Sequence, residues 1–389
     1  MKLRKLALAG LGVALAATMA ACSTTTPTTP GTTAPATNSA PAAPTIDYTT
    51  DVGVVLSDVS QPRWVMAQAA FQAAMPGVQI KFSGNDTSVE ANNVDAFIAA
   101  GVKVLVINSI DGAAAAAETD KAHAAGIPVI AYDRLIMNTA NVAYYATFDS
   151  IAVGAAQGKY LADQAKAAGT KGQNLYLFAG DVADNNAFLF FQGAWSQLQP
   201  LIADGTFNVV NSPQAVDLKD VASLSRDQES QIMGPITTKW DPTVAKQLAE
   251  SAVAQASTDQ KGTVYLLAPN DQTSQAITDT FRADAAVTTI YSTGQDLAKA
   301  SVQYILDDKQ SMTVFKSDKD LVAQTKSLVD SILNGQPADP SIVTTTYNNG
   351  TTDVPSTAAP IIVVTKDNIE QVVNDSGLYT ITNGVVADK

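Results

Sequence analysis

The sequence predicts an α/β protein built on parallel β-sheets, and three observations support this fold class. Short apolar runs alternate with alanine-rich stretches of helical length along most of the chain. This order is typical of parallel strands joined by right-handed helical crossovers. The apolar runs contain almost no polar residues, as expected for strands that are covered on both faces. Polar residues gather directly after these runs, where such folds place their binding loops.

The predicted elements follow one another from residue 52 onward. Short apolar runs are expected to be strands at 52–56, 78–82, 102–107, 128–131, 175–178, 264–268 and 287–291. Alanine-rich stretches are expected to be helices at 62–75, 89–100, 113–125, 151–168, 187–201, 244–256, 272–281 and 297–306. The third of these helices ends before Gly126, a typical position for a helix-ending glycine.

The N-terminus has the pattern of a lipoprotein leader. Three basic residues within positions 2–5 precede an apolar stretch at 6–17, and Met19-Ala20-Ala21-Cys22 follows. Small residues before a cysteine allow cleavage by a lipoprotein signal peptidase, and the thiol then carries lipid. We therefore expect 1–21 to be a signal peptide and Cys22 to be lipidated. The alternative is an ordinary secretory signal with an incidental cysteine. The apolar stretch is short for a membrane span.

Composition limits the classes of function. Residues 22–46 are rich in Thr and Pro and hold no charge, so we expect a flexible tether after the lipidated cysteine. The part from about residue 47 is long enough for two domains. A formal net charge of −13 without a basic run argues against nucleic acid and anionic membrane surfaces as partners. With Cys22 consumed by lipid and His123 the single histidine, most transition-metal and cysteine-nucleophile chemistry is excluded.

Polar side chains at the ends of the predicted strands suggest a sugar site. They are Asp58, Arg63, Trp64, Asp133, Arg134, Asp184, Asn185, Asn186, Asn270, Asp271, Gln295 and Asp296. Carboxylates and amides match the hydroxyls of a sugar in pairs, and arginine adds a two-pronged donor. The apolar face of a pyranose can pack on Trp64 or Trp240. No glycine-rich phosphate loop is present, so a nucleotide is not the expected ligand.

Eight short motifs carry a resemblance to a known family. They are AYDRLI (131–136), YYATFDS (144–150), DNNA (184–187), KWDP (239–242), PND (269–271), TGQD (293–296), SMTVFK (311–316) and YNNGTTDVPS (347–356). In this order and spacing, the chain from about 52 to 379 resembles the extracytoplasmic sugar-binding proteins of ABC importers. It is most similar to the xylose-binding and multiple-sugar-binding members, and KWDPTVAK favours the multiple-sugar branch.

The resemblance implies the type I periplasmic-binding-protein fold. Two similar, doubly wound parallel-sheet lobes would be joined by three crossing segments and would close on a monosaccharide. The N-terminal lobe would hold 47–148 and 316–345, and the C-terminal lobe 149–315 and 346–389. Apart from the resemblance, the polar character of the segment 217–238 suggests a loop that folds over the cleft.

The resemblance also implies roles for individual residues. The expected ligand-binding residues are Arg63, Trp64, Asp133, Arg134, Asp184, Asn186, Trp240, Asn270, Asp296 and Lys316. Trp240 would stack on one face of the sugar, and Asn185 would support its loop. Relatives often have a Gly-Ser-Pro run where this chain has Gly180-Asp181-Val182-Ala183, so the pose of the sugar is open.

Several of these residues could instead have structural roles. Asp133 and Arg134 could form an ion pair after a strand, Trp240 could be a core residue, and Asn270 could serve the turn before a helix. Asp184 could cap a helix and still accept a sugar hydroxyl with its other oxygen. Trp195 is expected in the core.

The favoured hypothesis is a lipid-anchored, monomeric receptor outside the cytoplasm, at the cell surface or in a periplasm. It would bind an aldose such as xylose, glucose or galactose and deliver it to an ABC permease, without a cofactor or metal. One alternative is a sugar sensor for a signalling receptor. A less favoured one is a glycoside hydrolase using Asp133 and Asp184, although Arg134 and the neighbouring asparagines are expected to hold these carboxyl groups ionised.

Overall fold

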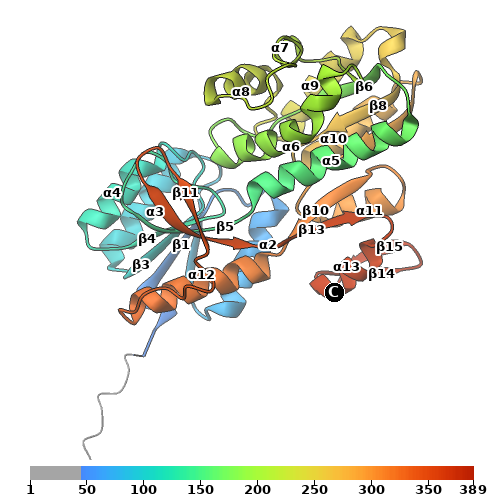
Figure 1. Cartoon of the computed structure of the whole chain (residues 1–389). Helices are drawn as coiled ribbons and strands as arrows, with labels where there is room; N and C mark the ends of the chain where they lie inside the picture. Colours follow the sequence, from blue (N-terminus) through green and yellow to red (C-terminus); the bar gives the residue numbers. More distant parts are fainter. Residues whose placement is uncertain (1–44) are drawn as a thin grey trace, which may run out of the picture. The chain divides into compact units, whose positions relative to one another are not determined.

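The computed structural model describes residues 45–389, which belong to one compact unit of the chain (Figure 1). The predicted signal peptide, the lipidation of Cys22 and residues 22–44 of the predicted tether lie outside the described residues. Within residues 45–389, no helix combines the length and the apolar character needed to cross a bilayer.

The larger sheet has seven strands in the spatial order β11-β12-β5-β4-β3-β1-β2. Their bounds are β1 (Val52–Leu56), β2 (Gln79–Phe82), β3 (Val104–Ile107), β4 (Val129–Tyr132), β5 (Val142–Phe148), β11 (Thr345–Asn348) and β12 (Asp353–Ala359). All neighbours pair in parallel except β11 and β12, which pair antiparallel.

A second, four-stranded parallel sheet has the order β7-β6-β8-β9. Its strands are β6 (Gln173–Leu177), β7 (Phe207–Val209), β8 (Gly262–Leu267) and β9 (Val287–Ser292). Two antiparallel pairs complete the strands, namely β10 (Met312–Lys316) with β13 (Ile361–Thr365), and β14 (Tyr379–Thr382) with β15 (Val385–Asp388). The predicted α/β class with parallel sheets is therefore confirmed.

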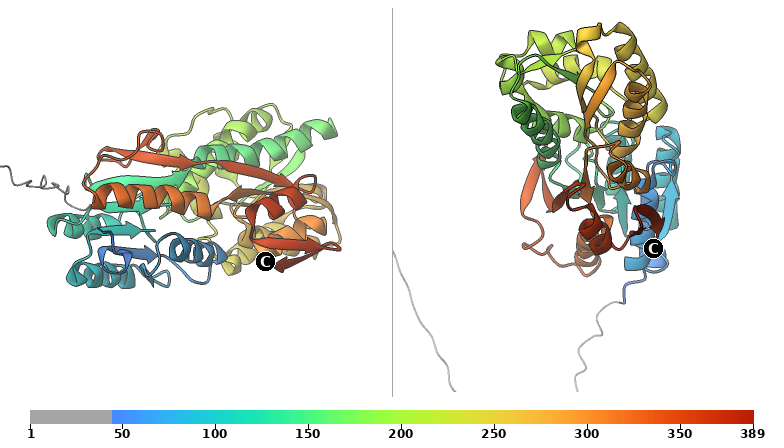
Figure 2. Two further views of the ribbon diagram at one scale, coloured as in Figure 1. Left: turned by 90° about the horizontal axis from the view of Figure 1, so that it is seen from below. Right: turned by 90° about the vertical axis from the view of Figure 1, so that its right-hand side faces the viewer.

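Helices connect the strands and cover the sheets (Figures 1 and 2). They are α1 (Tyr48–Asp51), α2 (Pro62–Ala74), α3 (Thr87–Ala100), α4 (Ala115–Ala124), α5 (Ser150–Ala168), α6 (Asn185–Ala203), α7 (Pro213–Asp217), α8 (Arg226–Met233), α9 (Pro242–Gln255), α10 (Asp271–Arg282), α11 (Lys299–Leu306), α12 (Asp318–Leu333) and α13 (Ile369–Ser376). Two short 3₁₀ turns are η1 (Gly234–Ile236) and η2 (Thr258–Gln260). Several helices begin after a carboxylate or amide that accepts backbone N–H groups, as Asp86 does for α3 and Asp149 for α5.

Alternating residues of the central strands pack on opposite helix layers. In β1, Val54 belongs to the cluster that holds Phe71 of α2, and Val55 to the cluster that holds Phe97 of α3. In the smaller sheet, Leu177 packs with the α5 and α6 side chains, and its neighbour Tyr176 packs with the α9 and α10 side chains. Since successive strand side chains point to opposite faces, each sheet is covered on both sides, as its apolar strands predicted.

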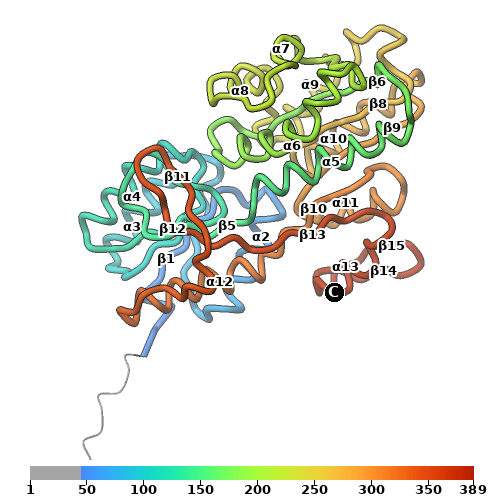
Figure 3. Tube along the Cα trace, viewed as in Figure 1, coloured from blue at the N-terminus to red at the C-terminus, as the bar shows by residue number. Residues whose placement is uncertain are grey.

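The chain crosses between the two sheets three times, which can be followed in Figure 3. It passes from β5 of the larger sheet to α5 over the smaller one, and returns from β10 to α12, whose Leu321 and Leu328 join the core of the larger sheet. The third passage leads from β12 to β13. The expected two-lobe fold with three crossing segments is therefore present.

One expected boundary differs from the structure. Residues 346–359 were expected in the C-terminal lobe, but β12 pairs in parallel with β5, with Ser356 opposite Tyr145. This pairing extends the larger sheet, because β5 would otherwise leave an open edge there. The other limits of the two lobes stay a prediction.

The part of the segment 217–238 from residue 226 to 236 is also helical and not a loop over the cleft. It forms α8 and η1, and Ile232 and Met233 are fully buried in the core cluster that contains α6. The indole of Trp195 donates a 2.9 Å hydrogen bond to the carbonyl of Val221. The segment therefore packs on α6 because its apolar residues are buried there, and Trp195 is a core residue as expected.

Candidate functional site

All ten predicted ligand-binding residues line one cavity between the two lobes. Its lining is Gln61, Arg63, Trp64, Asp133, Arg134, Asp184, Asn186, Phe190, Trp240, Asn270, Gln295, Asp296 and Lys316. The other three lining residues are outside the ten, although Gln295 belongs to the polar residues that follow the predicted strands. Gln61 and Gln295 are near neighbours of predicted residues, and Phe190 lies one helical turn after Asn186 on α6.

The ends of secondary-structure elements place these side chains. Asp133 and Arg134 directly follow β4, and Lys316 is the last residue of β10. Asp184 and Asn270 are the N-caps of α6 and α10. The carboxyl ends of parallel strands and the N-termini of the following helices lie at the same sheet edge. Residues that are far apart in sequence therefore converge on the cavity.

A chain of ion pairs crosses the cavity. The guanidinium of Arg63 pairs with Asp133 and lies 3.4 Å from Oδ1 of Asp296, which lies 3.0 Å from Nζ of Lys316. Burial acts to raise the pKa of Asp133, but the positive charges of Arg63 and Lys316 more than offset it and hold the pKa below its usual value. Asp133 is therefore an ionised acceptor at neutral pH.

A second ion pair joins the lobes at Arg134. Its Nε lies 3.1 Å from Oδ2 of Asp184, and its Nη1 donates to the carbonyl of Ser109 at 3.2 Å. The other oxygen of Asp184 caps α6 by accepting from the backbone N–H of Asn186 at 2.9 Å. Burial raises the pKa of Asp184, and Arg134 offsets only part of this rise. Arg134 and the backbone N–H of Asn186 therefore oppose a raised pKa of Asp184, as expected, but burial has the larger effect.

Asn186 is tied to the protein by both atoms of its amide. Its Nδ2 donates to the carbonyl of Asp133 at 2.7 Å, and its Oδ1 lies 3.0 Å from the hydroxyl of Tyr145. The backbone of Asp133 has a φ of 61°, an unusual conformation for a residue other than glycine. Asn186 therefore helps to hold this conformation from the opposite lobe, and its role as a sugar ligand stays a prediction.

Aromatic rings form the remaining walls. The guanidinium groups of Arg63 and Arg134 lie 5.0 and 5.3 Å from the ring centroid of Trp64. Trp240 is 8% exposed and meets Phe190 edge to face at 6.2 Å. An aromatic ring at a polar cavity can pack on the C–H face of a sugar, so both a stacking role and a packing role are open to Trp240.

Several buried polar atoms of the lining have no hydrogen-bond partner. They are Nε of Arg63, Nε1 of Trp64, Nε1 of Trp240 and Oε1 of Gln295. Asn270 uses its Oδ1 to accept from the backbone and hydroxyl of Thr273 at 3.2 and 2.6 Å, which leaves its Nδ2 to donate. A buried polar group without a partner costs about 1–3 kcal/mol. A ligand with several hydroxyl groups would satisfy these donors and this acceptor.

The cavity is narrow because its charged side chains reach one another. The space within it for a water-sized sphere is about 20 Å³, which is enough for about one water molecule. A larger ligand therefore enters only if these side chains rearrange or the lobes move apart, as in hinge closure of two-lobed binding proteins.

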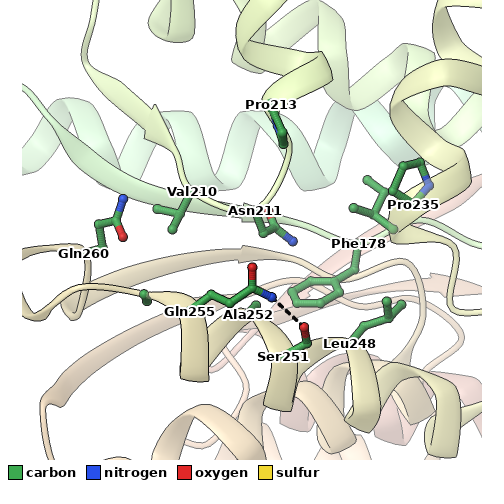
Figure 4. Close-up of a pocket in the computed structure, with 12 residues that line it drawn as sticks. Phe178, Val210, Asn211, Pro213, Pro235, Leu248, Ser251, Ala252, Gln255 and Gln260 are labelled. Atoms are coloured by element: carbon green, nitrogen blue, oxygen red, sulfur yellow. Dashed lines mark hydrogen bonds between the residues drawn. The ribbon is translucent and has the colours of Figure 1, made fainter.

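A second hollow lies within the smaller-sheet lobe (Figure 4). It has a volume of about 460 Å³ and is lined by residues that include Phe178, Pro213, Pro235 and Gln255. Figure 4 shows Gln255 turned toward Ser251, whose Oγ accepts its hydrogen bond at 2.7 Å. No predicted ligand-binding residue and no charged side chain lines this hollow, so it does not compete with the interlobe cavity as the functional site.

Together, the two parallel-sheet lobes and the polar cavity between them define a two-lobed solute-binding protein. The family model described as "Periplasmic binding protein domain" matches residues 52–337. The chain belongs to the periplasmic binding protein family.

Known sugar-binding members of this class are similar to the chain. The multiple sugar-binding periplasmic receptor ChvE of Rhizobium radiobacter is 33% identical over 338 residues, which cover 84% of this chain and 90% of that protein. The D-xylose-binding periplasmic protein of Escherichia coli (strain K12) is 28% identical, with 84% and 90% covered. A carbohydrate transporter solute-binding protein from Chloroflexus aurantiacus, solved in complex with D-glucose, is 49% identical with a TM-score of 0.82, and 85% and 98% are covered.

Proposed function

We propose that the protein is a receptor for a neutral monosaccharide and that D-glucose or a similar aldose binds in the interlobe cavity. The observation that carries the proposal is the lining of this cavity, where unpartnered buried donors lie beside carboxylates, amides and two tryptophans. The similar protein from Chloroflexus aurantiacus was solved with D-glucose. This likeness at 49% identity supports a hexose as the first ligand to test.

The charge balance of the cavity supports an uncharged sugar. Its lining holds the cations Arg63, Arg134 and Lys316 and the carboxylates Asp133, Asp184 and Asp296. Each cation already lies beside a carboxylate of the protein. A sugar acid or an amino sugar would bring an unbalanced charge into a buried site, which is costly. Hydroxyl groups, in contrast, can share the oxygens and N–H groups of these pairs.

The wider role would be delivery of the sugar to an ABC permease. The two lobes would open and close about a hinge, and bound sugar would favour the closed state. The closed lobes would present a surface that the permease recognises.

Lipidation at Cys22 would hold the receptor at the membrane on the side away from the cytoplasm. A Cys22→Ser variant is expected to leave the membrane fraction, and its unchanged retention there would contradict the anchor.

Thermal unfolding with a panel of sugars tests the binding proposal. The chain from residue 45 onward, the compact unit of the structure, would be measured with glucose, xylose, galactose, arabinose, ribose and fucose, and with glucuronate and glucosamine. A sugar at a hundred times its Kd stabilises the fold by about 2.7 kcal/mol, which raises Tm by a few degrees. We expect a shift with one or more neutral aldoses and none with the charged analogues.

Two further measurements separate binding at this site from other outcomes. The Asp133→Ala and Trp240→Ala variants are expected to lose the sugar-induced shift while still unfolding cooperatively. A shift of wild-type size in both variants would mean that the sugar binds elsewhere. Incubation with nitrophenyl glycosides is expected to release no nitrophenol, and turnover that disappears in Asp184→Asn would favour a hydrolase instead.

A further inference from the structure

We infer that Asp271, which does not line the cavity, is a positioning residue that holds the loop carrying Gln295 and Asp296 in its binding conformation. This inference rests on the proposed sugar binding. Asp271 is the first residue of α10 and is 1% exposed. Asp296 lines the cavity from the loop between β9 and α11.

The loop has a backbone that needs external support. Asp296 and Leu297 have φ angles of 102° and 55°, which side-chain-bearing residues rarely adopt. Leu297 is fully buried, so this conformation also fixes a core side chain. Such conformations persist only where surrounding contacts determine them, and they gather at ligand sites.

The carboxylate of Asp271 supplies these contacts on the far side of the loop. Its Oδ2 accepts the backbone N–H of Ala298 at 2.8 Å, directly after the two strained residues. Its Oδ1 accepts from Nε2 of Gln310 at 2.9 Å and from the hydroxyl of Thr313 at 2.8 Å. The backbone N–H of Asp271 donates to the carbonyl of Gln295 at 3.1 Å. Asp271 thus bonds to the loop on both sides of Asp296.

The same carboxylate connects the loop to the crossing segment. Thr313 belongs to β10, whose last residue, Lys316, pairs with Asp296. The neighbouring Val314 accepts from the N–H of Asp296 at 2.8 Å and donates to the carbonyl of Gly294 at 3.1 Å. A Cβ at Gly294 would collide with Oδ1 of Asp271. Glycine at this position therefore allows the carboxylate to sit directly against the loop backbone.

Burying the charged carboxylate of Asp271 lowers the stability of the fold. This cost favours a specific role for Asp271 over simple packing. Burial and the charge of Asp296 raise the pKa of Asp271 to about 7. Burial, and to a smaller extent the charge of Asp271, raise the pKa of Tyr379 of β14 to about 12. The N-terminus of a helix offsets part of the cost of a carboxylate, and the three donors described above offset more.

A double-mutant cycle on sugar affinity tests the inference. Titration calorimetry with D-glucose, or with the aldose that stabilises the wild type most, would compare Asp271→Asn, Asp296→Asn and the double variant. We expect Asp271→Asn to weaken binding at least about tenfold and the double variant to bind no more than about twofold more weakly than Asp296→Asn alone. Two residues that act through one contact are non-additive in this way.

Two results would contradict the positioning role of Asp271. Unchanged affinity in Asp271→Asn, or losses that multiply in the double variant, would overturn the inference. If Asp271→Asn does not fold, Thr313→Val takes its place in the cycle and the same criteria apply.

Asp51→Asn is the matched control, because Asp51 is also buried, at 7% exposed, and bonded to Lys103 at 2.9 Å. It should lower Tm without changing affinity. Wild-type protein that binds no sugar would instead refute the proposed function.

Discussion

Gly180 shows how closely the backbone approaches an aromatic side chain at the site. A Cβ atom built on Gly180 would lie less than 3.0 Å from three atoms of the Trp240 ring. Gly180 has no positive φ, so glycine is needed here for space and not for backbone conformation. Trp240 itself has a φ of 58°, and its ring rests directly on the Gly180 backbone.

Replacing Gly180 by alanine should therefore displace Trp240. We expect Gly180→Ala to weaken sugar binding by about tenfold or more and to lower stability by about 1–3 kcal/mol, the usual cost of overpacking. The matched control is Gly234→Ala, because a Cβ at Gly234 meets nothing within 4 Å and its φ is −52°. Calorimetry and denaturant unfolding measure both effects. Equal affinities in the two variants would show that the position of Trp240 does not matter for binding.

At the scale of secondary-structure elements, two cavity residues, Asp184 and Asn270, cap helices with their side chains. Asp184 caps α6 with one oxygen and pairs with Arg134 through the other. Asp86 caps α3 in the same way, accepting from Ser88 and Val89, but it is exposed. The two residues therefore differ mainly in the buried partner that Asp184 has across the cavity.

The two caps should respond differently to alanine. Asp86→Ala is expected to cost about 1 kcal/mol of stability, as for an ordinary cap, and to leave sugar affinity unchanged. Asp184→Ala also strands the buried guanidinium of Arg134, and breaking such a pair costs about 3–5 kcal/mol. It should also abolish sugar binding. Urea unfolding and calorimetry measure both, and similar losses of stability in the two variants would contradict this account.

At the scale of the whole molecule, stability depends on acids buried away from the cavity. Glu90 on α3 is fully buried, and burial together with Glu118 on α4 raises its pKa to about 8. The charge of Arg134 lowers this pKa and that of Asp111 raises it. Burial raises the pKa of Glu118 to about 7. Both groups bind protons more tightly in the folded state than in the unfolded state.

The sign of the pH effect follows from this difference. Between the ordinary pKa of 4.5 and about 8, folded Glu90 keeps its proton whereas unfolded Glu90 loses it, so its contribution to stability falls as pH rises. Glu90→Gln should remove this contribution, and its Tm relative to the wild type should increase from pH 5 to pH 8. The exposed Glu370→Gln is the control and should show no such trend. A constant difference between Glu90→Gln and wild type would contradict the expected protonation.

Local patterns in the sequence were sufficient for much of the fold. The strand 52–56 agrees with β1 at both ends, and most predicted helices agree with the structure to within a few residues. Apolar runs and capping residues act between near neighbours in sequence, so they can be read without knowing the tertiary fold. The predicted helix at 297–306 begins later, at Lys299, because Leu297 has a positive φ and belongs to the loop that carries Asp296.

The sequence by itself determined the fold class, and its resemblance to sugar-binding proteins named ten polar and aromatic residues that the structure brings to one cavity. Only the tertiary structure decided which of them bond to one another, because those contacts join residues far apart in the chain. Arg63 reaches Asp296 across 233 positions, and β12 joins β5 beyond the reach of any local pattern. Gln61 and Phe190 also line the cavity because of contacts between distant parts of the chain. Such contacts form only when distant elements pack together. The helices and strands themselves depend on apolar periodicity and capping residues, which are local in sequence.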